Sequence, residues 1–315
     1  MNMQSPRHLL ALRDHPPAFL EAVLATAARV KADPSRAGSA LAGRKLYLLF
    51  QKTSTRTALS FAVGMHELGG FAFSQAWGES NFSVGEIEDE IRYVARNVDA
   101  VVARLRRHAD LARMAAACPV PVINGCCERS HPCQALADLL TLRELFGGLE
   151  VTVLYVGVRN NVLNSLVESL PRLGGRLLAL TPVVNDPARD DALLEAARAG
   201  GRFSELDPRT TRAELRDAIA SVDAVYTDTW VDMESFHDPA SRDEKQARIQ
   251  ALAPFRLDQD LLAGSRAVVL HDMPIHAGLE ITRPLAEAHM DTILRQAENR
   301  RHAQKGLLLE LLGGG

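Results

Sequence analysis

The sequence predicts an α/β protein with two domains, each built on a parallel sheet flanked by helices. Three observations lead to this prediction. Short apolar runs alternate with amphipathic helical patterns along most of the chain, as in the strand–helix–strand units of parallel sheets. Gly147 and Gly148 interrupt this alternation near its middle. The 315 residues, 47% of them hydrophobic, suffice for two ordinary cores. We expect domains at residues 1–147 and 148–289, followed by a closing segment at 290–315.

Strands and helices alternate in the first half of the chain. Apolar stretches predict strands at 46–50, 71–75, 100–105 and 120–124. Helical patterns precede, separate or follow them, at 18–31, 54–68, 85–98, 109–117 and 132–146. The last of these helices begins with Pro132, at a position where a helix tolerates a missing N–H group.

The second half repeats the alternation. Strands are predicted at 151–156, 176–180, 202–206, 224–227 and 267–271. Helices are predicted at 161–173, 188–199, 212–221, 243–252 and 290–312. Ligands of such sheets bind beyond the carboxyl ends of the strands. Polar loops that directly follow strands therefore mark the expected binding edge of each domain.

Composition narrows the classes of function. A net charge of -3 provides no basic surface for nucleic acid or an anionic membrane. No apolar run is long enough to span a bilayer, and the start of the chain lacks a signal-peptide pattern. Four cysteines in such a chain indicate reduced thiols, so we expect a cytoplasmic protein. Cys126, Cys127 and Cys133 lie near His131, but they are too crowded to predict a metal site.

The turn after the first strand is the first candidate site. The strand at 46–50 leads through a polar turn into a helix that opens with Ser54, Thr55, Arg56 and Thr57. A helix start offers unpaired backbone N–H groups and the positive end of the helix dipole. Three hydroxyls and a guanidinium add directed donors, so the turn suits a dianionic phosphate. An ordinary hydroxyl-capped helix with a surface arginine would show the same local pattern.

The second candidate site combines Arg104, at the end of a strand, with His131 and Gln134. The latter two lie three residues apart at a helix start, so both can face one ligand. A histidine and an amide can polarise a C=O group and fix an NH2 group, which suits a carbonyl or carbamoyl ligand. A capping histidine beside a buried glutamine is the alternative interpretation.

Polar residues also follow the strands of the second half. Asn160 and Asn161 open a helix and offer amides to a zwitterionic ligand, although asparagines commonly serve only as turn and capping residues. The glycine fingerprint of a dinucleotide-binding turn is absent there. Asp228 directly follows a buried strand, where a carboxylate is placed to bind an ammonium group. Pro274 follows the last strand, where a cis bond would aim backbone carbonyls inward.

Taken in order, these motifs resemble those of the aspartate/ornithine carbamoyltransferase family, most closely on its ornithine side. Its members carry a Ser-Thr-Arg-Thr turn, a later arginine, a His-Pro-x-Gln motif, an Asn-Asn loop, an acidic Asp-x-Trp-x-x-Met loop and a His-x-x-Pro turn. Here these are residues 54–57, Arg104, 131–134, 160–161, 228–233 and 271–274. The likeness covers nearly the whole chain and includes its final helix.

The resemblance implies a carbamoyltransferase whose C-terminal helix packs back across the domains to the first one. The first domain would bind carbamoyl phosphate through Ser54, Thr55, Arg56, Thr57, Arg104, His131 and Gln134. The second would bind an amine substrate through Asn160, Asn161, Asp228, Asp232, Met233, His271, Asp272, Met273 and Pro274. The resemblance implies Arg56, Arg104, His131 and Gln134 as catalytic groups, and we add Asp272, where the chain departs from the family pattern, as a further candidate. A homotrimer with a shared active site is also implied, in which Trp77 or Ser80 of a neighbouring subunit touches the phosphate. No metal or organic cofactor is expected.

In the implied reaction a neutral amine attacks the carbamoyl carbon, a tetrahedral oxyanion forms, and phosphate leaves. An alkyl ammonium has a pKa of about 10.4, so only about one molecule in a few thousand is nucleophilic at pH 7. The site must therefore desolvate the amine or accept its proton.

The chain departs from the family pattern mainly near the amine. Ala58 and Ala277 stand where arginines are usual, and Val158 stands where an aspartate is usual. The usual His-Cys-Leu-Pro is here His-Asp-Met-Pro at 271–274, and the usual Ser-Met-Gly is Asp-Met-Glu at 232–234. These changes remove positive charge and add negative charge, which leaves ornithine, another diamino acid or a diamine as candidate acceptors.

Asp272 is the most consequential of these changes. A carboxylate that merely pairs with the attacking ammonium would raise the pKa of that ammonium and oppose catalysis. We hypothesise that Asp272 either accepts the proton of the amine or holds a second, non-reacting ammonium. His276 is a candidate to replace the missing arginine in part. The lost arginines leave one alternative function, a non-catalytic ligand-binding relative. The missing glycine fingerprint disfavours a Rossmann-type oxidoreductase.

Overall fold

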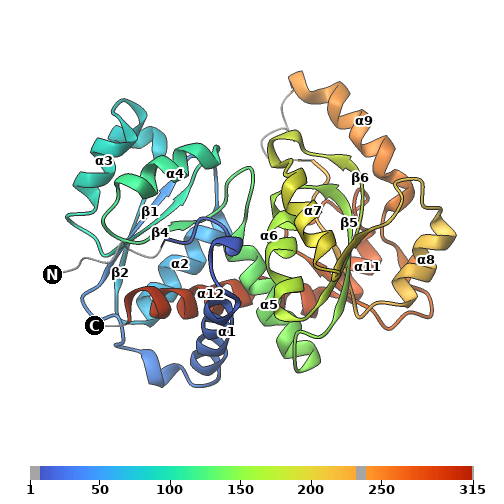
Figure 1. The fold of residues 1–315 in the computed structure, drawn as a ribbon, viewed down its shortest axis with the longest axis horizontal. Coiled ribbons are helices and arrows are strands. Elements are labelled where there is room, and N and C mark those ends of the chain that lie inside the picture. Colours follow the sequence, from blue (N-terminus) through green and yellow to red (C-terminus); the bar gives the residue numbers. More distant parts are fainter. Residues whose placement is uncertain (1–7, 232–238, 314–315) are drawn as a thin grey trace. The chain divides into compact units, whose positions relative to one another are not determined.

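The computed structural model describes residues 8–231 and 239–313 and divides into two compact units (Figure 1). Unit 1 comprises Met1–Thr141 and Glu298–Gly315, and unit 2 comprises Leu142–Ala297. The divisions fall inside helices α5 (Pro132–Phe146) and α12 (Met290–Leu312), so each of these helices contributes residues to both units. The boundary that the sequence suggested, at residues 147 and 148, directly follows α5.

Unit 1 contains a parallel sheet with the strand order β2-β1-β3-β4. The strands are β1 (Lys45–Phe50), β2 (Phe71–Ala76), β3 (Ala100–Arg104) and β4 (Val122–Asn124). Besides α5 and α12, the helices are α1 (Pro17–Ala32), α2 (Thr55–Glu67), α3 (Ile87–Val94) and α4 (His108–Ala117). Buried apolar residues of β1 and β3 pack against α3 and α4, which forms one core of the unit.

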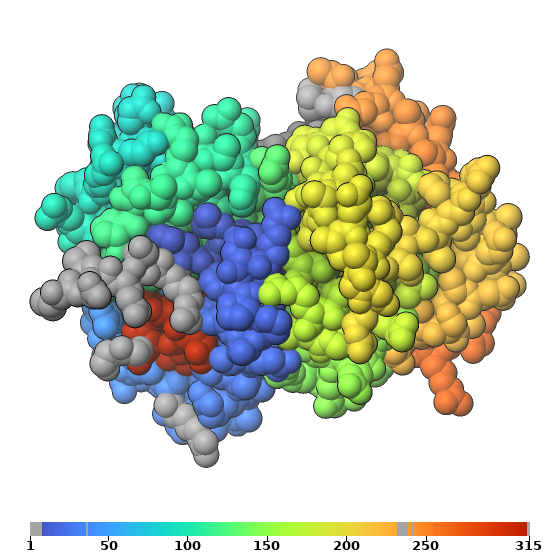
Figure 2. Space-filling model, in the orientation of Figure 1, coloured from blue at the N-terminus to red at the C-terminus, as the bar shows by residue number. Residues whose placement is uncertain are grey.

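The C-terminal helix packs back onto the first helices of unit 1, as the sequence predicted. A Cβ atom at Gly306 of α12 would lie 2.4 Å from the carbonyl oxygen of Val23 in α1, so this close approach requires glycine. Lys305 is 1% exposed, and its Nζ lies 2.6 Å from Oε2 of Glu67 in α2. In Figure 2 the blue N-terminal segment covers part of the dark red α12. These contacts join the two ends of the chain within one unit.

Unit 2 contains a second parallel sheet, with the strand order β7-β6-β5-β8-β9. The strands are β5 (Thr152–Arg159), β6 (Arg176–Val184), β7 (Phe203–Glu205), β8 (Ala224–Thr227) and β9 (Val268–His271). The helices are α6 (Asn161–Ser169), α7 (Asp191–Ala199), α8 (Arg212–Ala220), α9 (Arg242–Leu252), α10 (Gln259–Leu262) and α11 (Arg283–Ala288). The two parallel sheets flanked by helices confirm the predicted fold class.

Most differences from the predicted elements lie at helix ends. The helix expected at 188–199 begins instead at Asp191, because the Asp190 side chain caps it by accepting from the Leu193 N–H. The helix expected at 161–173 ends at Ser169 and continues as a 3-10 turn that contains Pro171, which has no N–H to continue the α-helical pattern. Helix α11 was not predicted from the sequence. Within the described residues, no helix is long and apolar enough to cross a membrane.

Candidate active site

The turn at residues 54–57, which we call the phosphate turn after its predicted ligand, lies at the switch point of the sheet in unit 1. The chain leaves β1 to form β2 on one side and then returns to form β3 on the other side. Loops that leave the two strands at such a point form the usual binding crevice of a parallel sheet. Phe50 pairs with Arg104 across β1 and β3, so residues 54–57 and Arg104 emerge at the same sheet edge.

The start of α2 is open to an anion. Ser54 is the N-cap residue of α2, but its hydroxyl makes no capping hydrogen bond. The N–H groups of a first helical turn have no partner inside the helix, so they remain oriented toward the N-terminal side. Ser54 and Arg56 are half-buried, Thr55 is exposed, and Thr57 is fully buried. The hydroxyl-capped alternative is therefore not what the structure shows.

His131 is 5% exposed and precedes the first residue of α5. Burial lowers its pKa well below the ordinary value, and the positive charges of Arg300, Arg104 and Arg56 lower it further. The structure thus brings Arg56 and Arg104 close to His131. The imidazole is neutral at pH 7, so it keeps one N–H to donate to a carbonyl oxygen and one nitrogen without a proton.

Gln134 presents an acceptor in the same place. Its side chain is buried, and Nε2 donates to Oδ1 of Asp138 at 2.8 Å. The other amide atom, Oε1, is buried and has no hydrogen-bond partner among the described residues. A buried carbonyl without a partner is costly, so this atom suits a ligand that brings an N–H group. Asp138 thus orients the Gln134 amide so that Oε1 of Gln134 is available to that ligand.

Arg300 lies near these candidate groups of unit 1, although no role was predicted for it from the sequence. It lies on α12 and is 3% exposed, and its Nη1 is 3.4 Å from Oγ1 of Thr57. Among the charges that lower the pKa of His131, that of Arg300 has the largest effect. Arg300 therefore brings a guanidinium to the start of α2, where Ala58 supplies none. The only sequence signal was the family-like pattern of the final helix.

Trp77 and Ser80 lie in the loop after β2. The Trp77 ring packs against Phe82 with the ring centroids 5.4 Å apart. The Ser80 hydroxyl donates to the carbonyl oxygen of Trp77 at 2.7 Å. These contacts are local to unit 1, and the expected contact of this loop with a neighbouring subunit stays a prediction.

Unit 2 has an equivalent switch point between β5 and β8. Asn160 follows β5, and its Oδ1 accepts from the N–H groups of Val162 and Leu163 and so caps α6. Its Nδ2 donates to Oδ2 of Asp228, just past β8, at 2.6 Å. Asn160 is thus both a helix cap and an orienting partner of Asp228. Asn161 follows as the half-buried first residue of α6.

Asp228 and Asp272 lie together at this edge. Asp228 is 5% exposed, and its backbone neighbour Thr229 donates an N–H to Oδ1 at 2.6 Å. Burial raises the pKa of Asp228 well above its ordinary value, and the charge and hydrogen bond of Asp272 raise it further. His271 and Asn160 act in the opposite direction. Two carboxyls can hydrogen-bond only if they share a proton, so the proximity of Asp272 favours the protonated form of Asp228.

His271 is fully buried beneath the Asp272 turn. Its Nδ1 accepts from the Met273 N–H at 2.9 Å, so the proton sits on Nε2, which faces Oε1 of Glu280 at 3.1 Å. Both ring nitrogens of His271 thus contact groups in the segment that follows β9. Met273 has a φ of 62°, a conformation uncommon for residues other than glycine, and the Met273–Pro274 bond is cis. Asp232 and Met233, the other expected amine-binding residues, lie outside the described residues.

The cysteines near His131 are buried, and none of them forms a disulfide within the described residues. Burial raises the pKa of Cys127 to about 11 and that of Cys133 to about 12, so both are protonated at neutral pH. Over residues 8–231 and 239–313, no group of histidine, cysteine, aspartate and glutamate side chains is arranged to hold a metal ion.

Comparisons with known proteins agree with this architecture. The carbamoyl-phosphate-binding domain of the aspartate/ornithine carbamoyltransferases matches residues 7–144, and the Asp/Orn-binding domain matches residues 149–311. An ornithine carbamoyltransferase of Methanoculleus marisnigri is 40% identical over 303 residues, with 94% of each chain covered. One of Archaeoglobus fulgidus is 36% identical, with 98% of each chain covered.

A solved structure is also similar over the whole length. The ornithine carbamoyltransferase from Pyrococcus furiosus superposes with a TM-score of 0.87 at 33% identity, and the match covers 99% of this chain and 98% of that one. Together with the two domain matches, these similarities show that the chain belongs to the aspartate/ornithine carbamoyltransferase family.

Proposed function

We propose that this protein transfers the carbamoyl group of carbamoyl phosphate to the side-chain amine of ornithine or an ornithine-like diamino acid or diamine. The products are a ureido compound and phosphate. One observation carries the proposal: His131 is buried, and its burial together with the charges of Arg300, Arg104 and Arg56 lowers its pKa well below the ordinary value. Such a site attracts a phosphate dianion and still offers a neutral N–H donor to an uncharged carbonyl.

Binding of carbamoyl phosphate is assigned to unit 1. The N–H groups and hydroxyls at 54–57, with Arg56 and Arg104, hold the phosphate, and Arg300 adds positive charge at Thr57. His131 donates to the carbamoyl oxygen, and the unpartnered Oε1 of Gln134 accepts from the carbamoyl NH2. These contacts orient the carbamoyl carbon for attack.

The reaction then needs a neutral nitrogen nucleophile, which we assign to an amine bound by the candidate residues of unit 2. The amine attacks the carbamoyl carbon, and its lone pair forms the new C–N bond. The C=O electrons move onto oxygen, where His131 and Arg104 stabilise the oxyanion. The C–O bond to the phosphate breaks as the C=O bond re-forms, and phosphate leaves with that electron pair. One proton departs from the nitrogen, and Asp272 is the proposed acceptor unless it instead holds a second ammonium.

Acceptor identity is tested by a panel of ornithine, lysine, putrescine, diaminopropionate and diaminobutyrate, each supplied with carbamoyl phosphate. We expect phosphate release together with a ureido product that mass spectrometry identifies, with ornithine or a close analogue turned over fastest. Release of phosphate without a ureido product would indicate hydrolysis only. If no acceptor gave phosphate release or a ureido product while carbamoyl phosphate still bound, the result would favour the non-catalytic alternative.

We further propose a cytoplasmic homotrimer with an active site shared between subunits. Support comes from β2, an edge strand whose Phe71 and Phe73 are 62% and 50% exposed. The two side chains share one face of the strand, and the strand leads directly into the loop with Trp77 and Ser80. An edge strand with exposed aromatic side chains is a natural contact surface for another copy of the chain.

Light scattering coupled to gel filtration tests the assembly. We expect about three times the chain mass of 34.4 kDa for the unmodified protein. Phe73→Glu is expected to produce smaller species and to lower activity at least about tenfold, because a charge would be buried at the contact. Leu294→Glu, at an exposed apolar residue of α12 in unit 2, is the control and should leave the mass unchanged. A monomeric unmodified protein with full activity would contradict the proposal.

A further inference from the structure

Gln51 lies between the two phosphate-binding elements of unit 1. It follows the last residue of β1 and precedes the turn at 54–57 by three positions. Across the sheet it faces the end of β3, because Phe50 is paired with Arg104. Its own position therefore depends on both elements.

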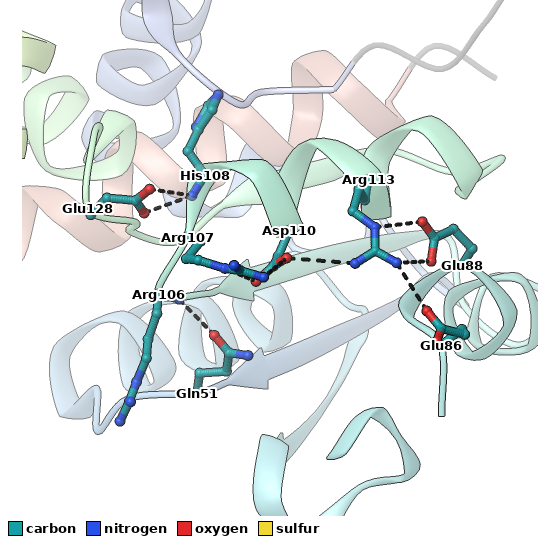
Figure 3. Close-up of polar contacts among 9 residues, drawn as sticks. All are labelled: Gln51, Glu86, Glu88, Arg106, Arg107, His108, Asp110, Arg113 and Glu128. Carbon is teal, nitrogen blue, oxygen red and sulfur yellow. Dashed lines mark hydrogen bonds and ion pairs between the residues drawn. The ribbon is translucent and has the colours of Figure 1, made fainter. Parts of the chain in front are cut away.

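The contacts of Gln51 extend the β1–β3 ladder past its end. The Gln51 N–H donates to the carbonyl oxygen of Arg104 at 2.9 Å. The Gln51 Oε1 accepts from the backbone N–H of Arg106 at 2.7 Å, as Figure 3 shows. Gln51 thus makes hydrogen bonds to the main chain on both sides of Leu105. Both contacts lie directly after the Cα atom of Arg104, so the backbone that leaves β3 behind the Arg104 guanidinium is tied to β1.

The other side of this turn is held independently. The Glu128 carboxylate accepts from the His108 N–H through both oxygens, at 2.8 and 2.7 Å, at the start of α4 (Figure 3). Arg107 pairs with Asp110 within the same helix start. Leu105 itself is buried in the core. Loss of the Gln51 side chain therefore leaves the turn folded but removes the restraint that faces the phosphate turn.

We propose that Gln51 is a positioning residue that sets the place of Arg104 relative to the phosphate-binding turn at 54–57. The inference rests on the proposed function. A single hydrogen bond from a part-exposed side chain contributes little to global stability. A misplacement of about 1 Å at a charged contact can nevertheless cost about a hundredfold in rate. The side chain therefore affects carbamoyl phosphate binding more than it affects folding.

Two substitutions separate positioning from stability. Gln51→Met keeps the length of the side chain but removes the strong acceptor, and Gln51→Glu keeps an acceptor for the Arg106 N–H. We expect Gln51→Met to raise KM for carbamoyl phosphate about tenfold, with KM for the amine within about twofold of the unmodified value. Gln51→Glu should restore KM for carbamoyl phosphate to within about threefold.

Hydrogen exchange and melting temperature provide readouts that do not depend on turnover. The Arg106 amide should exchange faster in Gln51→Met and at nearly the normal rate in Gln51→Glu. The melting temperature of both should stay within about 4 °C of the unmodified protein. Gln259→Ala is the matched control, because it also removes one side-chain hydrogen bond of a glutamine, to Thr282 in unit 2. It should change none of the kinetic constants.

The outcomes distinguish this inference from the proposed function. If the unmodified protein neither binds nor uses carbamoyl phosphate, both are overturned. If the unmodified protein is active and Gln51→Met has an unchanged KM for carbamoyl phosphate, only the positioning role is overturned. Equal losses in Gln51→Met and Gln51→Glu, or a fall in melting temperature that accounts for the loss, would also overturn it.

Discussion

Replacing Arg56 with alanine is expected to lower kcat/KM for carbamoyl phosphate by about three orders of magnitude. Arg56 is half-buried at the start of α2, and its charge reaches His131. Loss of a charge-assisted, partly desolvated contact to a dianion costs several times more than loss of a neutral hydrogen bond. The backbone N–H groups of α2 cannot replace its planar fork of charged donors.

Arg56→Lys should recover part of this loss, because it keeps the charge but not the bidentate geometry. Arg113→Ala is the matched control. Arg113 is an exposed arginine of α4 that pairs with Glu86 and Glu88, as Figure 3 shows, and its removal should change kcat/KM less than about twofold. If Arg56→Ala retained kcat/KM within tenfold of the unmodified enzyme, the assignment of the phosphate to α2 would fail.

Replacing Asp272 with asparagine is expected to lower acceptor turnover about a hundredfold, the usual range for loss of a general base. If Asp272 accepts the proton of the amine, kcat falls and the order of preference among acceptors stays the same. If it instead holds a second ammonium, KM rises for acceptors that carry two positive charges and the order of preference changes. Asp207→Asn, at an exposed aspartate paired with Arg209 in unit 2, should do neither. Unchanged turnover together with unchanged preference would rule out both roles.

The same variant changes the pH dependence in a defined direction. Burial is the main cause of the raised pKa of Asp228, and the negative charge of Asp272 adds to it. Without that charge the pKa of Asp228 falls, although burial still keeps it above the ordinary value. Any step that needs ionised Asp228 is lost on the acid side as pH falls through the Asp228 pKa. The acid limb of kcat/KM for the amine should therefore move to lower pH in Asp272→Asn.

Local patterns were enough to predict the strand, turn and helix around residues 54–57. The strand at 46–50, the polar turn and the helix that opens at Ser54 are set by residues close in sequence, and the structure places β1 and α2 there. What the sequence left open was whether the Ser54 hydroxyl closes the helix end. That depends on a side-chain hydrogen bond, and the structure shows none.

Arg300 could not be found in this way because its environment depends on the whole fold. It is separated from Thr57 by 243 residues, and it reaches α2 only because α12 packs back into unit 1. Nothing in the local sequence distinguishes it from its neighbour Arg301, which pairs with Glu67 and Glu298 instead. Similarly, the burial of Asp228 and its pairing with Asp272 arise from the meeting of β8 and β9.

A crystal of the protein soaked with carbamoyl phosphate would test the central claim most directly. We predict phosphate density at the start of α2, with the Arg56 guanidinium and the N–H groups of residues 54–57 within hydrogen-bonding distance. The carbamoyl oxygen should lie against His131, and its NH2 group should lie against Oε1 of Gln134. An empty turn with Arg56 directed to solvent, at a ligand concentration that saturates turnover, would contradict the account.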